Sequence, residues 1–207
     1  KMTYCTADST VSGVGTDSKA GQMSPRNMLT TTIGDELKVA TNFKSRVFGV
    51  SIKDRAAILP AGHAADAAYW IDSKQSKFIT STYYMKQLPA WVEKYNKKIS
   101  KYTSDLISYS PVGNEVTIDM AKNVISNEKL GQQGETDMLC VSFSSTDKIG
   151  HKYGTHCQII QDQFVDLDKR LADFFNYLDQ TIGKDEYLVF LTADYGAANN
   201  ILMNQKH

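Results

Sequence analysis

Residues 137–193 contain two short apolar runs separated by a long amphipathic stretch, and this pattern restricts the fold more than any other feature of the chain. The first run lies in residues 137–144 and the second in residues 187–192. Between them, apolar residues recur every three or four positions from Ile160 to Ile182, as on one face of a helix. Two parallel strands need a connection of this length. The pattern predicts a strand, a helix and a strand, and so an α/β/α sandwich of three layers with a mostly parallel sheet.

Both strands of this unit are expected to be buried on both faces, because their apolar residues follow one another without alternation. The helix is expected to pack one stripe of side chains against the sheet. This stripe consists of Ile160, Phe164, Leu167, Leu171, Phe174 and Leu178.

Upstream, residues 46–52 are β-branched and aromatic, which predicts a further strand. Helical spacing predicts helices over residues 88–99 and 116–125. Ser24 followed by a proline is typical of a helix start and predicts a helix over residues 24–41, preceded by a loop. Nothing resembling a linker interrupts residues 1–207, so we expect a single α/β domain.

Composition excludes several functional classes. The 23 basic residues balance the 23 acidic ones, so no net positive field attracts nucleic acid or an anionic membrane. The longest apolar runs hold five residues, far fewer than the roughly 20 that span a bilayer. Three cysteines supply neither a disulfide framework nor the paired spacing of a zinc ribbon. We therefore expect no nucleic-acid partner and no membrane-spanning segment.

Ligands of open α/β sheets bind beyond the carboxyl ends of the strands. Polar residues follow all three predicted strands: Lys53 and Arg55, Asp147 and His151, and Asp194 with Tyr195.

Asp147 and His151 are four residues apart, so a helix would place both side chains on one face. A carboxylate and an imidazole are suitable zinc ligands. Asp194 is expected nearby, because the crossover brings the two strand ends together. The alternatives are solvated turn residues for the first pair and a helix N-cap for Asp194.

Lys53 and Arg55 are two residues apart, so in an extended segment their side chains point the same way. Two converging cations are typical of an anion clamp, in which arginine contributes a bidentate fork. The alternative is a solvated turn in which both pair with neighbours such as Asp54.

Three segments, residues 53–63, 144–154 and 190–198, together resemble the alkaline phosphatase superfamily. The similarity is to the branch that includes PafA-type phosphatases and the type I phosphodiesterase/nucleotide pyrophosphatases. It implies two zinc ions, one bound by Asp147 and His151 and the other by Asp194 and the residue at position 195. It also implies that Lys53 and Arg55 contact the transferred phosphoryl group of a small phosphorylated substrate, and that the protein is periplasmic or secreted.

The chain departs from the family at several points. Tyr195 stands where the family has a histidine, and a phenol, with a pKa of about 10, binds zinc only as phenolate. The family's threonine nucleophile and one aspartate ligand have no counterpart before Lys1, and a last histidine ligand has none before His207. The segment between Asn96 and Pro111 is also shorter than in the family. We therefore expect a part of a larger catalytic domain that lacks N- and C-terminal portions.

The expected function is hydrolysis of phosphate monoesters, with the 207 residues alone inactive. One alternative is a phosphodiesterase or nucleotide pyrophosphatase. Another is a non-catalytic family member that binds a phosphorylated ligand. A nucleotide-binding domain without hydrolytic activity is disfavoured, because the chain contains no glycine-rich phosphate loop of the usual spacing.

Overall fold

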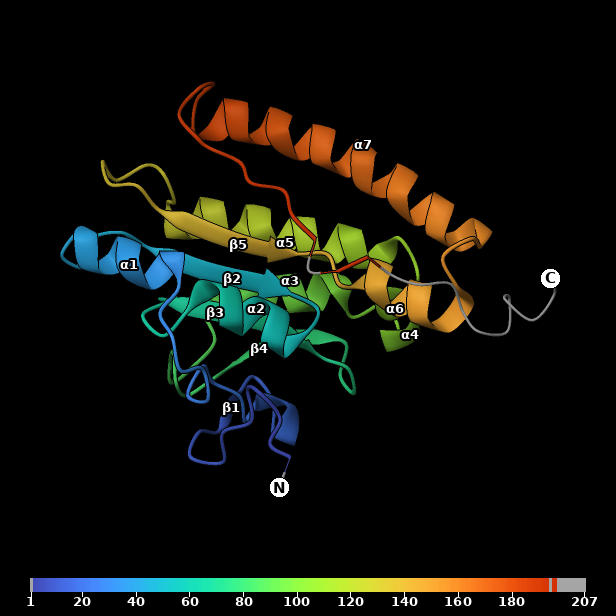
Figure 1. The fold of residues 1–207 in the computed structure, drawn as a ribbon, viewed down its shortest axis with the longest axis horizontal. Helices are drawn as coiled ribbons and strands as arrows, with labels where there is room; N and C mark the ends of the chain where they lie inside the picture. The colour runs from blue at the N-terminus through green and yellow to red at the C-terminus, as the bar shows by residue number, and fades with distance from the viewer. Residues whose placement is uncertain (1, 194, 197–207) are drawn as a thin grey trace.

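The computed structural model describes residues 2–193, 195 and 196, and these form one mixed sheet (Figure 1). The strands lie in the order β1-β4-β3-β2-β5. Strand β2 pairs in parallel with both β3 and β5, whereas β4 pairs antiparallel with β3 and β1. The parallel arrangement that we expected therefore holds for the three strands β3, β2 and β5. The bounds are β1 Gly13–Val14, β2 Val47–Ser51, β3 Ala67–Asp72, β4 Lys77–Ser81 and β5 Met138–Ser142.

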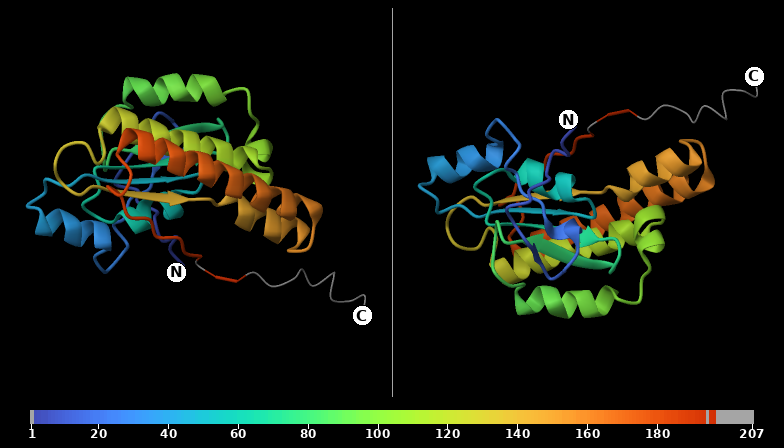
Figure 2. Two further views of the ribbon diagram at one scale, coloured as in Figure 1. Left: turned by 90° about the horizontal axis from the view of Figure 1, so that it is seen from above. Right: turned by 90° about the horizontal axis from the view of Figure 1, so that it is seen from below.

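Helices cover both faces of this sheet. Figure 2 shows α3, α5 and α7 on one side, with α1 and α2 on the other. The predicted α/β/α architecture is confirmed. No helix in the described part of the chain is long and apolar enough to cross a membrane. The helices are α1 Ile33–Ala40, α2 Asp54–Ala61, α3 Ala90–Ile99, α4 Ser104–Tyr109, α5 Val112–Glu128, α6 Ser145–Tyr153 and α7 Gln158–Thr181, with a short 3-10 helix at Lys19–Gly21.

Alternation along the central strands divides the core between the two faces. Phe48, Val50 and Tyr69 belong to the cluster under α3 and α5. On the opposite face, Trp70 packs with Ile58 of α2. Helix α2 approaches β2 so closely that a Cβ on Gly49 would lie 1.9 Å from the carbonyl oxygen of Ala57. Only glycine at this position permits the approach that fixes α2 beside the end of β2.

The predicted strand over residues 46–52 is β2, and the predicted helices over residues 88–99 and 116–125 are α3 and α5. The prediction of a helix from residue 24 is wrong, because α1 begins at Ile33. The Ser24 hydroxyl instead donates to Asp8 Oδ2 at 2.6 Å, within a loop. Thr32 and Asp35 form the reciprocal capping bonds that start the helix.

Helix α7 occupies the predicted residues but does not pack as expected. It lies alongside α5, beyond the edge of the sheet that β5 forms (Figures 1 and 2). Ile160 and Leu178 are buried, but Phe164 is 56% exposed. The prediction that the whole stripe is buried against the sheet is therefore wrong, since much of it borders solvent or α5.

The predicted strand over residues 187–192 is also wrong. These residues form no strand, and Leu188 and Phe190 are 79% and 84% exposed. Strand β5 consequently has β2 as its one partner in the described part of the chain, and its five residues are half-buried. An apolar run becomes a buried strand only when a neighbouring strand pairs with its backbone, and residues 187–192 have no such pairing.

Candidate functional site

The carboxyl ends of β2 and β5 lie side by side at one edge of the sheet. Their register pairs Ser51 with Ser142, the last residue of each strand. The Ser51 hydroxyl is 3.1 Å from the carbonyl oxygen of Ser142 and 3.0 Å from the hydroxyl of Ser144, which precedes α6. Short polar side chains therefore bind the two strand exits together, as expected for a ligand site of an α/β sheet.

Lys53 follows the end of β2 and occupies the N-cap position of α2, where its side chain makes no capping hydrogen bond. Its backbone N–H donates to Ser51 Oγ at 3.2 Å, which fixes the residue against the strand end. The Lys53 ammonium forms an ion pair with Asp147 Oδ2 across 94 residues of sequence. Its side chain is only 16% exposed, so this ion pair is largely shielded from water.

Asp147 and His151 lie on α6, where the spacing of four brings them together as predicted. His151 Nε2 is 3.0 Å from Asp147 Oδ1. Ile149, between them in sequence, is fully buried and holds the opposite face of α6 in the protein. Asp147 is therefore contacted on both carboxylate oxygens, by His151 on one and by Lys53 on the other.

Tyr195 completes what we call the Asp147 cluster, made up of Lys53, Asp147, His151 and Tyr195. Its hydroxyl donates to Asp147 Oδ1 and lies 2.9 Å from His151 Nε2. The phenol thus contacts both members of the predicted zinc-ligand pair. Asp194 lies outside the described residues.

Arg55 does not join this cluster through any described contact. It is the second residue of α2, so the expected extended geometry of residues 53–55 is wrong. Its Nη1 donates to Tyr4 Oη at 3.2 Å, and the Tyr4 hydroxyl donates to Asp54 Oδ1 at 2.6 Å. The hydrogen bond with Tyr4 is the largest influence on the pKa of Arg55, which is raised. Nothing in the sequence indicated this contact, because Tyr4 is 51 residues away.

Lys148 is a second cation close to the Asp147 cluster that the sequence analysis did not select. Its ammonium donates to Ser108 Oγ at 2.9 Å and so connects α6 with α4. Burial, followed by the charge of Lys53, lowers the pKa of Lys148. Lys53 and Lys148 are thus close enough to influence each other electrostatically.

The donors of the Asp147 cluster fit part of a zinc site. A carboxylate and an imidazole in contact are suitable, and about three protein ligands with an open position are typical of catalytic zinc. Among the described residues, no group of three or more histidine, cysteine, aspartate or glutamate side chains is placed to hold a metal ion. The described ligand set is therefore two residues, with Tyr195 as a third only if its phenol is deprotonated.

Comparison with known proteins gives a consistent family assignment. The sequence pattern of the type I phosphodiesterase/nucleotide pyrophosphatase family matches residues 22–206. Alkaline phosphatase PhoV of Synechococcus elongatus is 43% identical over 244 positions, covering 95% of this chain and 44% of that protein. A protein named calcium-transporting ATPase, from Myroides odoratus, is 44% identical over 248 positions, with coverage of 95% and 45%.

Alkaline phosphatase PafA of Elizabethkingia meningoseptica is 41% identical over 257 positions, covering all of this chain and 47% of that protein. The crystal structure of PafA superimposes with a TM-score of 0.93 over 98% of this chain and 49% of that one. The chain thus spans less than half the length of these relatives. The alignments are longer than the 207 residues of this chain, so they include gaps where the relatives carry additional residues.

The profile match, the sequence identity and the superposition agree with one another. The chain belongs to the type I phosphodiesterase/nucleotide pyrophosphatase family, in its PafA-like alkaline phosphatase branch.

Proposed function

We propose that these 207 residues are part of a larger catalytic domain that hydrolyses phosphate monoesters with the help of bound metal ions. The observation that carries the proposal is the contact of Asp147 with both Lys53 and His151 at the joined ends of β2 and β5. The relatives add support, because two of the three reported above are named alkaline phosphatases. The third name, an ATPase, also denotes hydrolysis of a phosphate bond.

In this proposal Asp147 and His151 bind one zinc ion, and Asp194 belongs to a second. When bound, zinc supplies positive charge that stabilises the oxygens of a phosphoryl group. Asp147 has a double role, because one carboxylate oxygen faces His151 while the other holds Lys53. The ion pair keeps the ammonium of Lys53 at the same edge of the sheet as the metal ligands.

Lys53 and Arg55 are proposed to bind the phosphoryl oxygens. Lysine acts as a compact charge, whereas the guanidinium of Arg55 offers two parallel N–H donors. A solved variant of PafA has a threonine, an asparagine, a lysine and an arginine replaced, and that lysine and arginine are two positions apart, as Lys53 and Arg55 are here. Such spacing supports a shared role for the pair. Tyr4 would then hold the Arg55 fork until substrate binds.

A second candidate function is binding of a phosphorylated ligand without turnover. It is favoured by the contact of the Tyr195 hydroxyl with both Asp147 and His151, because this phenol lies between the two proposed zinc ligands. A neutral phenol is a poor zinc ligand compared with the imidazole it replaces. Diester hydrolysis remains the alternative that the family description itself suggests.

The first experiment titrates the 207-residue chain with zinc against a chromogenic chelator and assays release of p-nitrophenol from p-nitrophenyl phosphate. We expect at most one weakly bound ion and no hydrolysis, because the described ligands are too few. Asp147→Ala and His151→Ala should each abolish zinc binding. Asp119→Ala is the matched control, since Asp119 pairs with Lys98 on the surface of α5. Stoichiometric binding of two ions, or hydrolysis lost in Asp147→Ala, would overturn the incomplete-site interpretation.

The second experiment uses the chain extended by its own natural flanking sequence. Arg55→Ala should lower kcat/KM for the monoester about 100- to 1,000-fold, the typical effect of one donor to a transition-state oxygen. The effect on bis-p-nitrophenyl phosphate should be smaller, because a diester has one fewer charged oxygen. An equal loss on both substrates would contradict the assignment to monoesters. Tyr195→His should raise zinc content towards two ions; phosphate binding without turnover in both proteins would favour the second candidate.

We further propose that the substrate is a small phosphorylated molecule and that the protein works in the periplasm or outside the cell. The equal numbers of basic and acidic residues support a small ligand over nucleic acid. Fractionation of cells that produce the complete protein tests the location; recovery only in the cytoplasm would contradict it.

A further inference from the structure

A fully buried glutamine of α7 donates to the first turn of α6. Gln163 has no exposed surface, and its Nε2 lies 3.0 Å from Ser145 Oγ and 3.4 Å from Thr146 Oγ1. These two hydroxyls immediately precede Asp147 in sequence. A side chain from another helix therefore contacts the turn from which the proposed zinc ligand projects.

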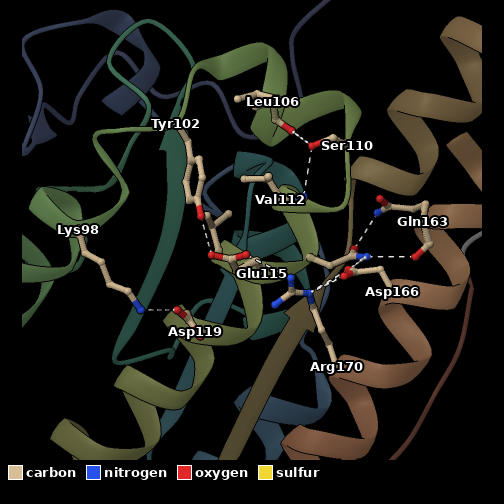
Figure 3. A network of polar contacts seen from close by, with 12 residues as sticks. Lys98, Tyr102, Leu106, Ser110, Val112, Glu115, Asp119, Gln163, Asp166 and Arg170 are labelled. Carbon is tan, nitrogen blue, oxygen red and sulfur yellow. Dashed lines mark hydrogen bonds and ion pairs between the residues drawn. The ribbon is translucent and has the colours of Figure 1, made fainter.

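The glutamine is itself held in place from α5. Its Nε2 donates to Asn114 Oδ1 at 2.7 Å, and Asn114 Nδ2 returns a bond to the backbone carbonyl of Gln163 at 3.2 Å. Asn114 Nδ2 also donates to Asp166 Oδ2 of α7 at 3.1 Å, and Asp166 accepts a hydrogen bond from Arg170 Nε. Arg170 Nη2 in turn donates to Glu115 Oε2 of α5 at 3.1 Å (Figure 3). The donor of Gln163 is thus fixed relative to both α5 and α7.

A second contact restricts α6 independently of these hydrogen bonds. A Cβ added to Gly113 of α5 would lie 2.4 Å from Ser145 Oγ and 2.7 Å from Ser145 Cβ. The absence of a side chain at Gly113 lets Ser145 lie directly against the backbone of α5, where its exposed fraction is 1%. The start of α6 is therefore fixed in distance by Gly113 and in direction by Gln163.

Stability alone does not account for a glutamine at this position. Its Oε1 is buried and has no hydrogen-bond partner among the described residues. A buried carbonyl without a partner is destabilising, whereas an apolar side chain of the same shape would avoid that cost. The amide differs from such a side chain in its ability to donate, to Asn114, which anchors it to α5, and to Ser145 and Thr146 on α6.

We propose that Gln163 is a positioning residue that orients Asp147 and His151. The side chains of a helix project outward from its axis. A rotation of α6 about this axis would therefore carry Asp147 away from Lys53 and away from the edge of the sheet. By holding the hydroxyls of Ser145 and Thr146, Gln163 sets this rotation. The inference rests on the proposed function, in which Asp147 and His151 bind zinc.

The test compares Gln163→Met with Leu178→Ala in the 207-residue chain. Methionine keeps the length of the side chain and removes the donor, while Leu178 is a buried residue near the other end of α7. Backbone NMR of the metal-free proteins reports the placement of α6, and thermal unfolding reports stability. Zinc titration reports the ligand pair.

We expect Gln163→Met to shift the amide resonances of Asp147 and His151 and the carboxylate carbon of Asp147. Zinc affinity should fall about tenfold, the lower end of the effect of losing a residue that supports metal ligands, because Gln163 acts on Asp147 through the two residues before it. Leu178→Ala should lower the unfolding temperature at least as much but leave the α6 resonances and zinc affinity unchanged. Unchanged α6 resonances in Gln163→Met, or equal zinc losses in both variants, would overturn the proposal.

Should Gln163→Met fail to fold, the double variant Ser145→Ala/Thr146→Val removes the acceptors instead and must give the same α6 shifts. The two proposals fail separately. If the chain extended by its own natural flanking sequence binds no zinc but Gln163→Met still displaces the Asp147 carboxylate resonance, the positioning role holds and the zinc assignment is wrong.

Discussion

The central strands and the last third of the chain contain similar apolar runs but have different environments. Every residue of β2 and β3 is buried, since each strand lies between two others and beneath helices. The residues of β5 are half-buried, and the apolar run at residues 187–192 is largely exposed. An apolar run shows that a segment gains from burial; whether it is buried depends on which backbone lies beside it.

The largest difference between the two regions should appear on truncation of a large side chain. Phe78 of β4 is fully buried in the main core, so Phe78→Ala should lower the free energy of unfolding by about 3–5 kcal/mol. Phe190→Ala, at a residue that is mostly exposed, should change it by less than about 0.5 kcal/mol. Urea denaturation measures both values. Similar losses in the two variants would show that residues 187–192 are as well packed in solution as the central strands.

The alkylation rate of Cys140 measures how well β5 itself is shielded from solvent. Burial raises the pKa of Cys140 from about 9 to about 11. Since the thiolate is the reactive form, alkylation of Cys140 at pH 8 should be on the order of 100-fold slower than that of an ordinary thiol. The rate should rise as the pH approaches 11. Mass spectrometry after iodoacetamide treatment measures it, with exposed Cys5 as the internal control; rapid labelling of Cys140 at pH 8 would mean that β5 is open to solvent.

The Lys53–Asp147 ion pair connects the two regions and should have a smaller effect. Both side chains are mostly shielded, so Lys53→Met should destabilise the chain by about 1–2 kcal/mol. The control is Lys44→Met, because the Lys44–Glu135 pair is largely exposed and should contribute at most about 0.5 kcal/mol. Thermal unfolding at low and high salt compares the two. An equal effect of both substitutions would mean that water screens the Lys53–Asp147 pair as fully as a surface pair.

The smallest effect is expected on the outer face of α7. Phe164→Ala should change the free energy of unfolding by less than about 0.5 kcal/mol, because Phe164 is mostly exposed. Ile160→Ala, one turn earlier and buried, should cost about 2–5 kcal/mol and serves as the control. A loss of several kcal/mol in Phe164→Ala would indicate that this face is covered in solution.

The sequence correctly predicted those elements whose own residues carry the signal, either as a long helical periodicity or as a continuous apolar run. The periodicity of α5 and α7 and the apolar runs of β2 and β5 sufficed to place them. Strands β3 and β4 were missed, although a polar turn from Asp72 to Ser76 between two short runs is typical of a hairpin. The packing of α7 and the strand over residues 187–192 were predicted wrongly, because both depend on tertiary neighbours that no local pattern specifies.

The candidate site divides in the same way. The spacing of four residues correctly brought Asp147 and His151 together, since helix geometry alone determines it. The contact of Arg55 with Tyr4 and the bonds from Gln163 to α6 join segments far apart in sequence. Each depends on the final packing of whole elements, and neither residue type is unusual enough to reveal it.

The direct pairing of β2 with β5 has a consequence for how the chain tolerates changes of length. These strands lie in register from Val47 opposite Met138 to Ser51 opposite Ser142, although about 90 residues separate them in sequence. Loop-closure entropy changes only slowly with the length of such a connection. The intervening segment can therefore grow or shrink without a large entropic cost to the pairing of the two strands. An insertion or deletion between the two strands would therefore leave Ser51, Ser142 and the exits that follow them in place.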